Sequence, residues 1–227
     1  MDNGEIDYAR YLVAHATNLN SFLIRDPRRL NDTQLQMVKD TIKFLKKTPL
    51  RIVTMGGPSV NEVVSVMKKG LSDGFKIFGV DYVQQINNPK YIGDPVGNIS
   101  YSSNQLRAFN MKYSVPVIVA SQFNRDIVHR GVDAEPGQAD FKGSGSLEQD
   151  ATILMALRKL EWSPEQLAEF PENLEENERG QLRLVPSWRI RSVAVKLFVI
   201  KNRNGPTGTT DPMKWDKATN RYEELQA

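Results

Sequence analysis

The sequence predicts an α/β fold in which a largely parallel sheet is flanked by helices. Two short apolar runs, 76–81 and 115–122, have the length of buried strands, and each ends in a polar residue. Segments with helical apolar spacing surround these runs, and such alternation is typical of parallel strands joined by helices. After about residue 190 the pattern becomes strand, glycine-rich turn, strand, which predicts an antiparallel hairpin at the sheet edge.

The first elements along the chain are predicted to be helices. Residues 6–18 and 32–47 carry apolar residues at helical spacing, and Asn31 is a typical N-cap for the second helix. Residues 51–55 are predicted to form a short strand between these helices and the rest of the fold.

A capping box predicts the start of a third helix. Ser59 can accept from the amide three residues on, while the carboxylate of Glu62 can reach back to the first amide. The strand 76–81 follows, then a loop rich in Asn, Pro and Gly, a helix around 103–112 and the strand 115–122.

The composition fits one globular domain and excludes several kinds of site. The 227 residues are 40% hydrophobic and 25% charged, which is ordinary for such a domain. The lack of cysteine excludes disulfides and thiolate metal sites and fits a reducing compartment, while two distant histidines argue against a histidine-based centre. The amino terminus has no apolar core and the longest apolar run, 115–120, is short. Neither a secretory signal nor a membrane span is expected.

The net charge of +3 is unevenly distributed. Residues 161–178 contain seven glutamates and no basic residue, so the remainder of the chain is more basic than the total suggests. That distribution is compatible with polyanion binding. Because Pro164 and Pro171 interrupt the acidic stretch, it is interpreted as a surface insertion within a single domain, 1–227.

Two candidate site residues end the predicted parallel strands, where ligands of open α/β sheets bind. Asp81 could hold Mg²⁺ beside nucleotide phosphates, although an aspartate that caps the next loop is the commoner case. Gln122 could orient a water molecule or sense a phosphate, or it could only mark the end of its strand.

The segment 123–146 is long and polar and ends in "FKGSGS". Glycine amides beside Lys142 suit a nucleic-acid phosphate backbone, and a flexible solvated loop is an equal alternative. The following "SLEQDA" is interpreted as a helix start, with Glu148 and Asp150 in its first turn, where carboxylates complement the helix dipole.

The segment "KNRNGPTG" (201–208) places two cations at a hairpin tip. Lys201 and Arg203 leave the same side of an extended segment, and the pair Asn204-Gly205 permits a turn with positive φ values. The cations either bind an anion or merely block edge-to-edge aggregation. No G-x-x-x-x-G-K-[ST] motif occurs, so a nucleotide site at Asp81 lacks a phosphate-cradling loop within this sequence.

Four segments resemble the DnaB-type replicative helicases and occur in the same order as in that family. These segments are "FGVDYVQQI", "VPVIVASQFNR", "DFKGSGSLEQDA" and "VIKNRNGPTGTT". The run from Ala9 to Gln34 resembles that family's helical stretch after the P-loop more loosely. The resemblance implies a RecA-like motor core that assembles into a ring, a hexamer in the full-length protein. Because the match begins just downstream of the family's Walker A loop, the chain is expected to be a partial RecA-like ATPase domain truncated on its P-loop side.

The resemblance implies a role for each residue of the nucleotide site. Asp81 takes the Walker B role and holds Mg²⁺ through water beside ATP, and Gln122 couples the state of the γ-phosphate to the DNA-binding loops. Lys201 and Arg203 form an arginine finger that reaches the γ-phosphate of the neighbouring subunit. Asp2 is the nearest counterpart of the catalytic glutamate.

Glu5 is the alternative to Asp2 as that carboxylate. Lys142, Gly143, Ser144 and Gly145 fall on the family's DNA-contacting loop, where Gly143 replaces a usual glutamate. The implied partners are single-stranded DNA, further copies of the chain, primase and a loader, and no membrane is implied. The implied location is the cytoplasm, in the replication of a bacterium, plasmid or phage.

Three functions fit these residues. The first is part of an ATP-dependent ring helicase that unwinds DNA in replication. The second is a non-hydrolysing RecA-like subunit that contributes DNA contacts and a trans-acting arginine finger. The third is a recombinase or circadian-type ATPase relative, which shares the fold without the "KNRNGPTG" tip.

Overall fold

The computed structural model describes residues 4–124, 134–141, 144–177 and 179–225. The chain divides into two compact units. The first unit holds Met55–Ala156 and Phe198–Gly208, and the second holds Asp2–Thr54, Leu157–Leu197 and Thr209–Ala227.

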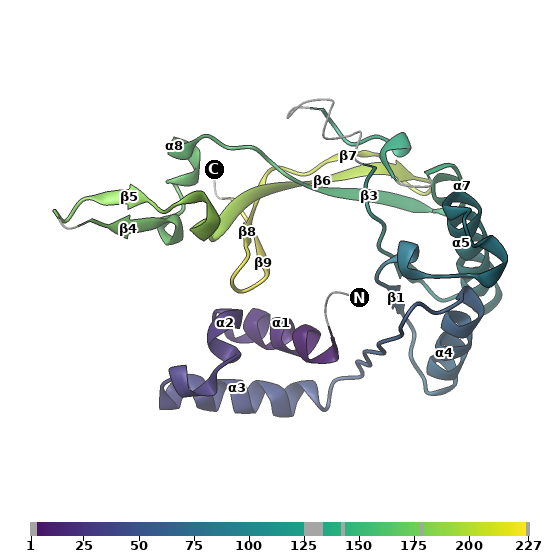
Figure 1. The fold of residues 1–227 in the computed structure, drawn as a ribbon, viewed down its shortest axis with the longest axis horizontal. Helices are drawn as coiled ribbons and strands as arrows, with labels where there is room; N and C mark the ends of the chain where they lie inside the picture. The colour runs from purple at the N-terminus through teal and green to yellow at the C-terminus, as the bar shows by residue number, and fades with distance from the viewer. Residues whose placement is uncertain (1–3, 125–133, 142–143, 178, 226–227) are drawn as a thin grey trace. The chain divides into compact units, whose positions relative to one another are not determined.

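The first unit contains a parallel strand pair covered by helices. Strands β1 (Phe78–Val80) and β2 (Val117–Val119) pair in parallel, with Val80 opposite Val119. Helices α4 (Val60–Ser72) and α5 (Pro95–Tyr113) pack against each other and bury one face of this pair (Figure 1). The capping box at Ser59 is confirmed, since the Ser59 amide donates to the Glu62 carboxylate over 2.8 Å.

Three predictions from the sequence differ from the structure. The predicted strand 51–55 is irregular backbone, with Val53 exposed and no strand partner among the residues described. The two parallel strands are three residues long and half-buried, because only one of their faces is covered. Helix α5 begins at Pro95 rather than near Ser103, since the Asp94 side chain caps it and proline suits the first helical position.

The uncovered face of the β1–β2 pair is apolar. Ile118 is 65% exposed and Ile77 is 63% exposed. Strand β3 (Ile153–Lys159) has a similar bare face, because Ile153 and Met155 are about half exposed while Leu154 is buried on the other side. A parallel sheet is normally covered on both faces, so the exposure of Ile77 and Ile118 is unusual for a finished α/β core.

Short elements connect these strands within the first unit. The 3₁₀ turns η2 (Val83–Gln85) and η3 (Pro89–Tyr91) lie between β1 and α5. The 3₁₀ turn η4 (Gln138–Asp140) and helix α7 (Ser144–Asp150) lie between β2 and β3.

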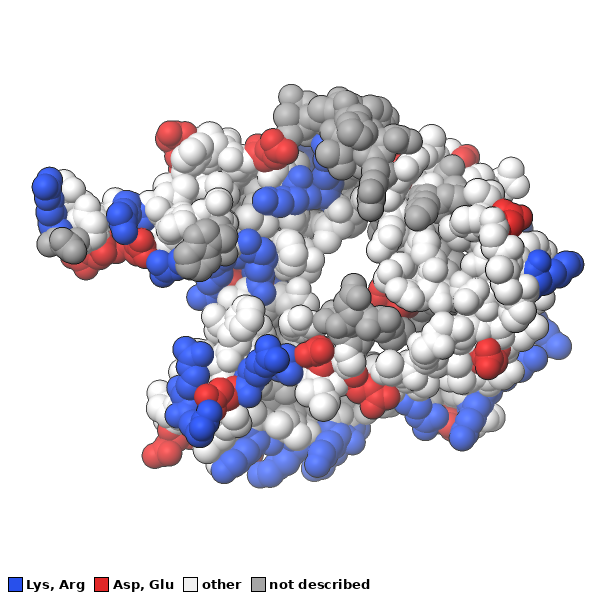
Figure 2. Space-filling model, in the orientation of Figure 1, with Lys and Arg blue, Asp and Glu red and all other residues white. Residues whose placement is uncertain are grey.

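The second unit begins with helices that pack together. They are α1 (Glu5–Thr17), α2 (Ser21–Ile24), η1 (Pro27–Arg29) and α3 (Asp32–Leu45). The predicted helices are confirmed, and the Asn31 side chain accepts from the Gln34 amide over 2.9 Å as the expected N-cap. Exposed lysines gather over α3, which accords with the basic character expected outside the acidic stretch (Figure 2).

A second sheet has the order β3-β6-β8-β9, with β7 also paired to β6. Its further strands are β6 (Ser192–Asn202), β7 (Gly208–Thr209), β8 (Met213–Asp216) and β9 (Arg221–Glu224). The β6–β8 and β8–β9 pairs are antiparallel, and β3 and β6 contribute residues to both units. The predicted α/β class with antiparallel strands near the carboxyl end is therefore confirmed.

The described residues of the predicted acidic insertion form short elements in the second unit. The insertion contains α8 (Pro164–Leu167), η5 (Pro171–Asn173) and β4 (Leu174–Glu176), and β4 pairs antiparallel with β5 (Leu182–Leu184) before η6 (Ser187–Arg189). Arginines offset part of its negative charge, since Glu175 accepts from Arg183 over 3.0 Å and from Arg189 over 2.5 Å.

One buried side chain ties this insertion to β6. The Asn173 amide group donates to the carbonyls of Leu167 and Ser192, and its oxygen accepts from the amides of Arg191 and Ser192, all within 2.9 Å. Asn173 is fully buried, so these four bonds satisfy it without water.

Candidate active site at the strand ends

The parallel pairing brings the two predicted strand-end residues to one edge of the sheet. Asp81 follows β1 directly and is exposed, and Gln122, shortly after the end of β2, is also exposed. Backbone bonds continue the pairing beyond the strands, because Ala120 donates to Val80 over 2.9 Å and Val83 donates to Ala120 over 3.0 Å. The two loops that carry the candidate residues are thus held side by side.

Gln84 joins these loops, and sequence reasoning missed it. Its amide nitrogen donates to the Ser121 hydroxyl over 2.8 Å, and its oxygen accepts from the backbone amide of Gln122 over 3.3 Å. A single side chain therefore uses both a donor and an acceptor to link the turn after β1 to the end of β2. The only available signal was its place shortly after Asp81.

The long segment after Gln122 is closed at its base. Phe123 and Phe141 form an antiparallel bridge and their ring centroids lie 5.0 Å apart. The Asn124 amide donates to the Asp140 carbonyl over 2.5 Å, and the Gly137 amide donates to the buried Asp140 carboxylate over 2.6 Å. The chain that leaves β2 is therefore returned to a fixed point just before the predicted DNA-contacting residues.

Two of the four predicted DNA-contacting residues lie outside the described residues. These are Lys142 and Gly143, whereas Ser144 and Gly145 form the start of α7. Helix α7 thus begins earlier than expected. Glu148 and Asp150 lie toward its carboxyl end, and the prediction that they occupy its first turn is wrong.

The cationic tip contacts the carboxyl end of α7. The Lys201 ammonium donates to the Glu148 carbonyl, and the Arg203 guanidinium donates to the Gln149 carbonyl over 2.5 Å. The Arg203 amide also donates to the Thr152 carbonyl over 3.0 Å. Cations at the carboxyl end of a helix are electrostatically favourable, so both side chains stabilise α7 in this state.

The turn at the tip is built differently from the prediction. Neither Asn204 nor Gly205 has a positive φ. The Asn202 side chain forms the turn instead, since its oxygen accepts from the Asn204 amide over 3.1 Å and its nitrogen donates to the Pro206 carbonyl over 3.2 Å. An asparagine that bonds to the backbone two residues on gives the same reversal without left-handed residues.

The predicted catalytic carboxylates lie outside the described part of the first unit, which carries the strand ends. Asp2 lies outside the described residues, and Glu5 is exposed in the first turn of α1, in the second unit. Within the described ranges no group of three or more His, Cys, Asp or Glu side chains could hold a metal ion, and no helix is long and apolar enough for a bilayer.

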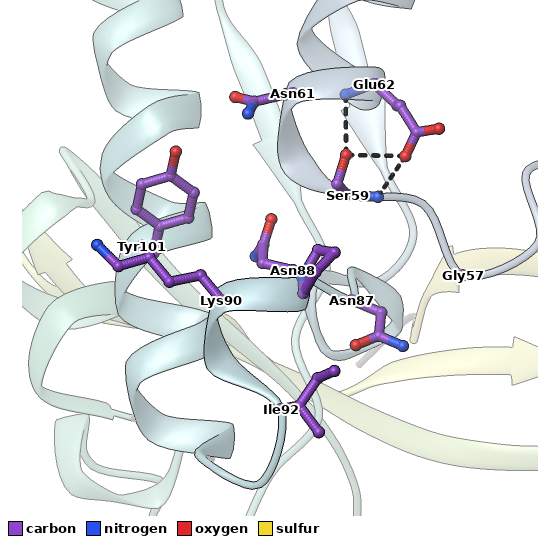
Figure 3. Close-up of a pocket in the computed structure, with 10 residues that line it drawn as sticks. Gly57, Ser59, Asn61, Glu62, Asn87, Asn88, Lys90, Ile92 and Tyr101 are labelled. Carbon is purple, nitrogen blue, oxygen red and sulfur yellow. Dashed lines mark hydrogen bonds between the residues drawn. The ribbon is translucent and has the colours of Figure 1, made fainter.

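A pocket of about 630 Å³ lies in the first unit between the start of α4 and the turn η3 (Figure 3). Its polar groups include Glu62, which is bonded to Ser59, together with Lys90 and Tyr101. Asn88, which also lines it, is buried and donates to Asn98 and Ser102, so it serves the packing of this loop. Sequence reasoning did not predict this pocket.

Comparisons with known proteins accord with this arrangement. Curated relatives include replicative DNA helicases DnaB from Buchnera aphidicola subsp. Baizongia pistaciae, 29% identical over 184 residues, and from Haemophilus influenzae, 25% identical over 217 residues. These alignments cover 80% and 94% of this chain but 35% and 41% of the relatives. The chain therefore spans about two fifths of the relatives' length.

Solved structures show the same fold. A DnaB-like replicative helicase, solved with its interactions with primase, matches 99% of this chain with a TM-score of 0.76 at 22% identity, and the match covers 49% of that helicase chain. A second solved structure, an ATPase domain, also matches 99% of this chain with a TM-score of 0.76, at 23% identity and over 72% of its own length. The model of the DnaB-like helicase C-terminal domain matches residues 1–224. The chain therefore belongs to the DnaB-like helicase C-terminal domain family.

Proposed function

We propose that this chain is part of an ATP-dependent ring helicase motor that translocates on single-stranded DNA and unwinds duplex DNA in replication. The observation that carries the proposal is the pair of strand ends joined by Gln84, which presents Asp81 and Gln122 together on a scaffold of this family. The segment between Gln122 and α7 then connects a nucleotide-facing edge to a loop suited to DNA.

The strand-end edge fits Mg²⁺ with a nucleotide rather than an all-protein metal cage. Asp81 offers an exposed carboxylate, and Mg²⁺ is commonly held by one or two carboxylates together with waters and phosphate oxygens. The bound ATP–Mg²⁺ would supply the phosphoryl group whose transfer to water drives the motor. In this proposal Asp81 binds the metal through water, and Gln122 reports the γ-phosphate to the loop that follows it.

Lys201 and Arg203 are proposed to serve a neighbouring subunit. The guanidinium of Arg203 uses one N–H for the Gln149 carbonyl, which leaves further donors for a phosphate. Arg203 is exposed, as a group that acts in trans must be. Asp2 and Glu5 remain the candidates for the carboxylate that activates water.

Lys142 to Gly145 are proposed to contact the backbone of single-stranded DNA from the inside of a hexameric ring. Each copy would contribute few phosphate contacts, so binding would depend on several subunits acting together. Primase and a loader are further proposed partners. The bacterial relatives support a location in the bacterial cytoplasm, where the replicated DNA would be that of the cell, a plasmid or a phage.

The exposed apolar residues of the two sheets could be covered by a segment that carries a phosphate-binding loop. Ile77 and Ile118 on one sheet, with Ile153 and Met155 on the other, are exposed where a complete α/β sheet would be covered. We propose that a strand, P-loop and helix from outside this sequence pack on them. Glycine-rich loop amides and a lysine would then face Asp81 and Gln122.

Joining the chain to such a segment tests the proposal. The strand, P-loop and helix of the Haemophilus influenzae relative would be fused ahead of residue 1, and ATP hydrolysis and forked-duplex unwinding would be measured. DNA-stimulated hydrolysis that is lost on Asp81→Ala is the expected result. A fusion that folds, binds ATP and hydrolyses none, yet restores hydrolysis to a finger-deficient variant of the complete Haemophilus influenzae relative, would instead establish the non-hydrolysing subunit.

A further inference from the structure

Helix α7 is fixed to α5 through its last residue. The Ser103 hydroxyl donates to one oxygen of Asp150 over 2.7 Å, and Arg107 donates to the other over 3.1 Å. The Asp150 side chain is 13% exposed. Leu147, about one turn earlier, is buried in the core that α4 and α5 share. The carboxyl end of α7 is therefore a firmly held point.

The cationic tip is attached to this same point. The carbonyls that accept from the tip, those of Glu148, Gln149 and Thr152, flank Asp150 in the sequence. Both cationic side chains of the tip and the Arg203 amide take part. The tip is thus bonded to the segment that Asp150 anchors to α5.

Helix stability does not explain a carboxylate at this position. A negative charge at the carboxyl end of a helix opposes the helix dipole. Here Arg107 pairs with Asp150, and Lys201 and Arg203 donate to the adjacent carbonyls, so these cations offset the unfavourable charge. The carboxylate of Asp150 is thus unfavourable for helix α7 alone, but it anchors the segment to which the tip is bonded.

We propose that Asp150 is a positioning residue for the Lys201 and Arg203 finger. It anchors α7 to α5, and α7 in turn aims the tip. The inference rests on the proposed function in one respect, that the ligand of the finger is a phosphate of a neighbouring subunit.

Spin labelling of the chain alone tests the positioning. The chain contains no cysteine, so Asn204→Cys places a single label at the tip. Asp150→Ala is expected to increase the mobility of the label. Asp150→Asn should give a smaller increase, since Ser103 can still donate to an amide oxygen while Arg107 no longer faces a charged partner. Asp94→Ala is the matched control. It removes the N-cap of α5 but no hydrogen bond between α5 and α7.

Turnover in the P-loop fusion tests the consequence. Misplacement of an aimed group lowers kcat, so Asp150→Ala should reduce kcat about tenfold or more while KM for ATP changes less than about twofold. Asp94→Ala should leave both near wild type. Unchanged label mobility in Asp150→Ala, or a kcat matching that of Asp94→Ala, overturns the proposal. If Arg203→Ala also keeps full turnover, the trans finger fails, while the label still reports whether Asp150 orders the tip.

Discussion

Gln84 and Asn173 show how single side chains organise this molecule at the residue scale. Each is an amide whose donor and acceptor are both used, Gln84 between two strand ends and Asn173 between the insertion and β6. An amide can bridge two backbone segments in this way because it offers donors and acceptors in one planar group.

Removing the proposed finger should strongly reduce hydrolysis in the P-loop fusion. Arg203→Ala leaves the nucleotide's own cradle intact, so ATP affinity should remain within about threefold, while turnover should fall on the order of 10³-fold or more. Mixing Arg203→Ala subunits with Asp81→Ala subunits should restore some activity, because each interface needs one finger and one metal site. If mixed rings form and no ratio of the two restores hydrolysis, the finger does not act in trans.

Truncating Asn173 should destabilise the second unit strongly. Asn173→Ala leaves two carbonyls and two amides without their partner, which should cost about 3 kcal/mol in the free energy of unfolding. Asn177→Ala, in the β4–β5 turn, should cost less than about 1 kcal/mol. Urea denaturation measures both, and equal losses would contradict a special role for Asn173.

At the scale of elements, an ion pair joins the end of β8 to the residue that precedes β6. Arg191 donates to both carboxylate oxygens of Asp216, over 2.9 and 2.6 Å, and the Ala218 amide donates to the first of them. Burial of Asp216 opposes its ionisation, yet these hydrogen bonds hold its pKa below the usual aspartate value.

Asp216 should therefore make stability depend on pH in the acid range. A folded-state pKa below the unfolded value gives stability that is present above the unfolded pKa and is lost as the pH falls through the folded pKa. Asp216→Asn should lower the melting temperature at neutral pH and flatten its decline below about pH 4. Asp40→Asn, on the exposed face of α3, should leave the profile nearly unchanged. A steep acid decline retained in Asp216→Asn would assign it to other carboxylates.

The loop before α7 should contribute electrostatically to DNA binding. If Lys142 makes the proposed phosphate contact, Lys142→Ala should flatten the slope of log K against log salt by about one unit for each contact removed. Binding of the fusion to a fluorescent oligothymidylate over a salt series measures this. Lys46→Ala, just after α3, serves as a charge control, and a slope that responds to Lys46 but not to Lys142 would remove the loop from the DNA path.

At the scale of the whole molecule, the sequence allowed prediction of features that local chemistry determines. The capping box at Ser59, the N-cap at Asn31 and the strand-end position of Asp81 each depend on neighbours a few residues away. The contact between Lys201 and Glu148 joins residues 53 positions apart, and no pattern within either segment indicates it. The early start of α7 was missed because its first residues are serine and glycine, which are weak helix formers.

Without a P-loop the chain should not hydrolyse ATP. Asp81 and Gln122 are proposed to form one side of a nucleotide site, but the β- and γ-phosphates need backbone amides and a lysine that this sequence does not provide. We expect no steady-state turnover from the purified chain. Turnover that follows the chain through successive columns and disappears in Asp81→Ala would show that its site is complete.

Because Asn173 bonds the insertion to β6, the β4–β5 turn is a suitable site for inserting a tag. The insertion is bonded to β6 by Asn173 and by Glu172, which accepts from the Ser192 hydroxyl. Arg179, Gly180 and Gln181 at the turn are exposed. Exposed turns between anchored ends tolerate inserted sequence well. A fluorescent protein or affinity peptide placed after Gly180 would therefore report on or immobilise the molecule without disturbing either terminus or the strand ends that carry Asp81 and Gln122.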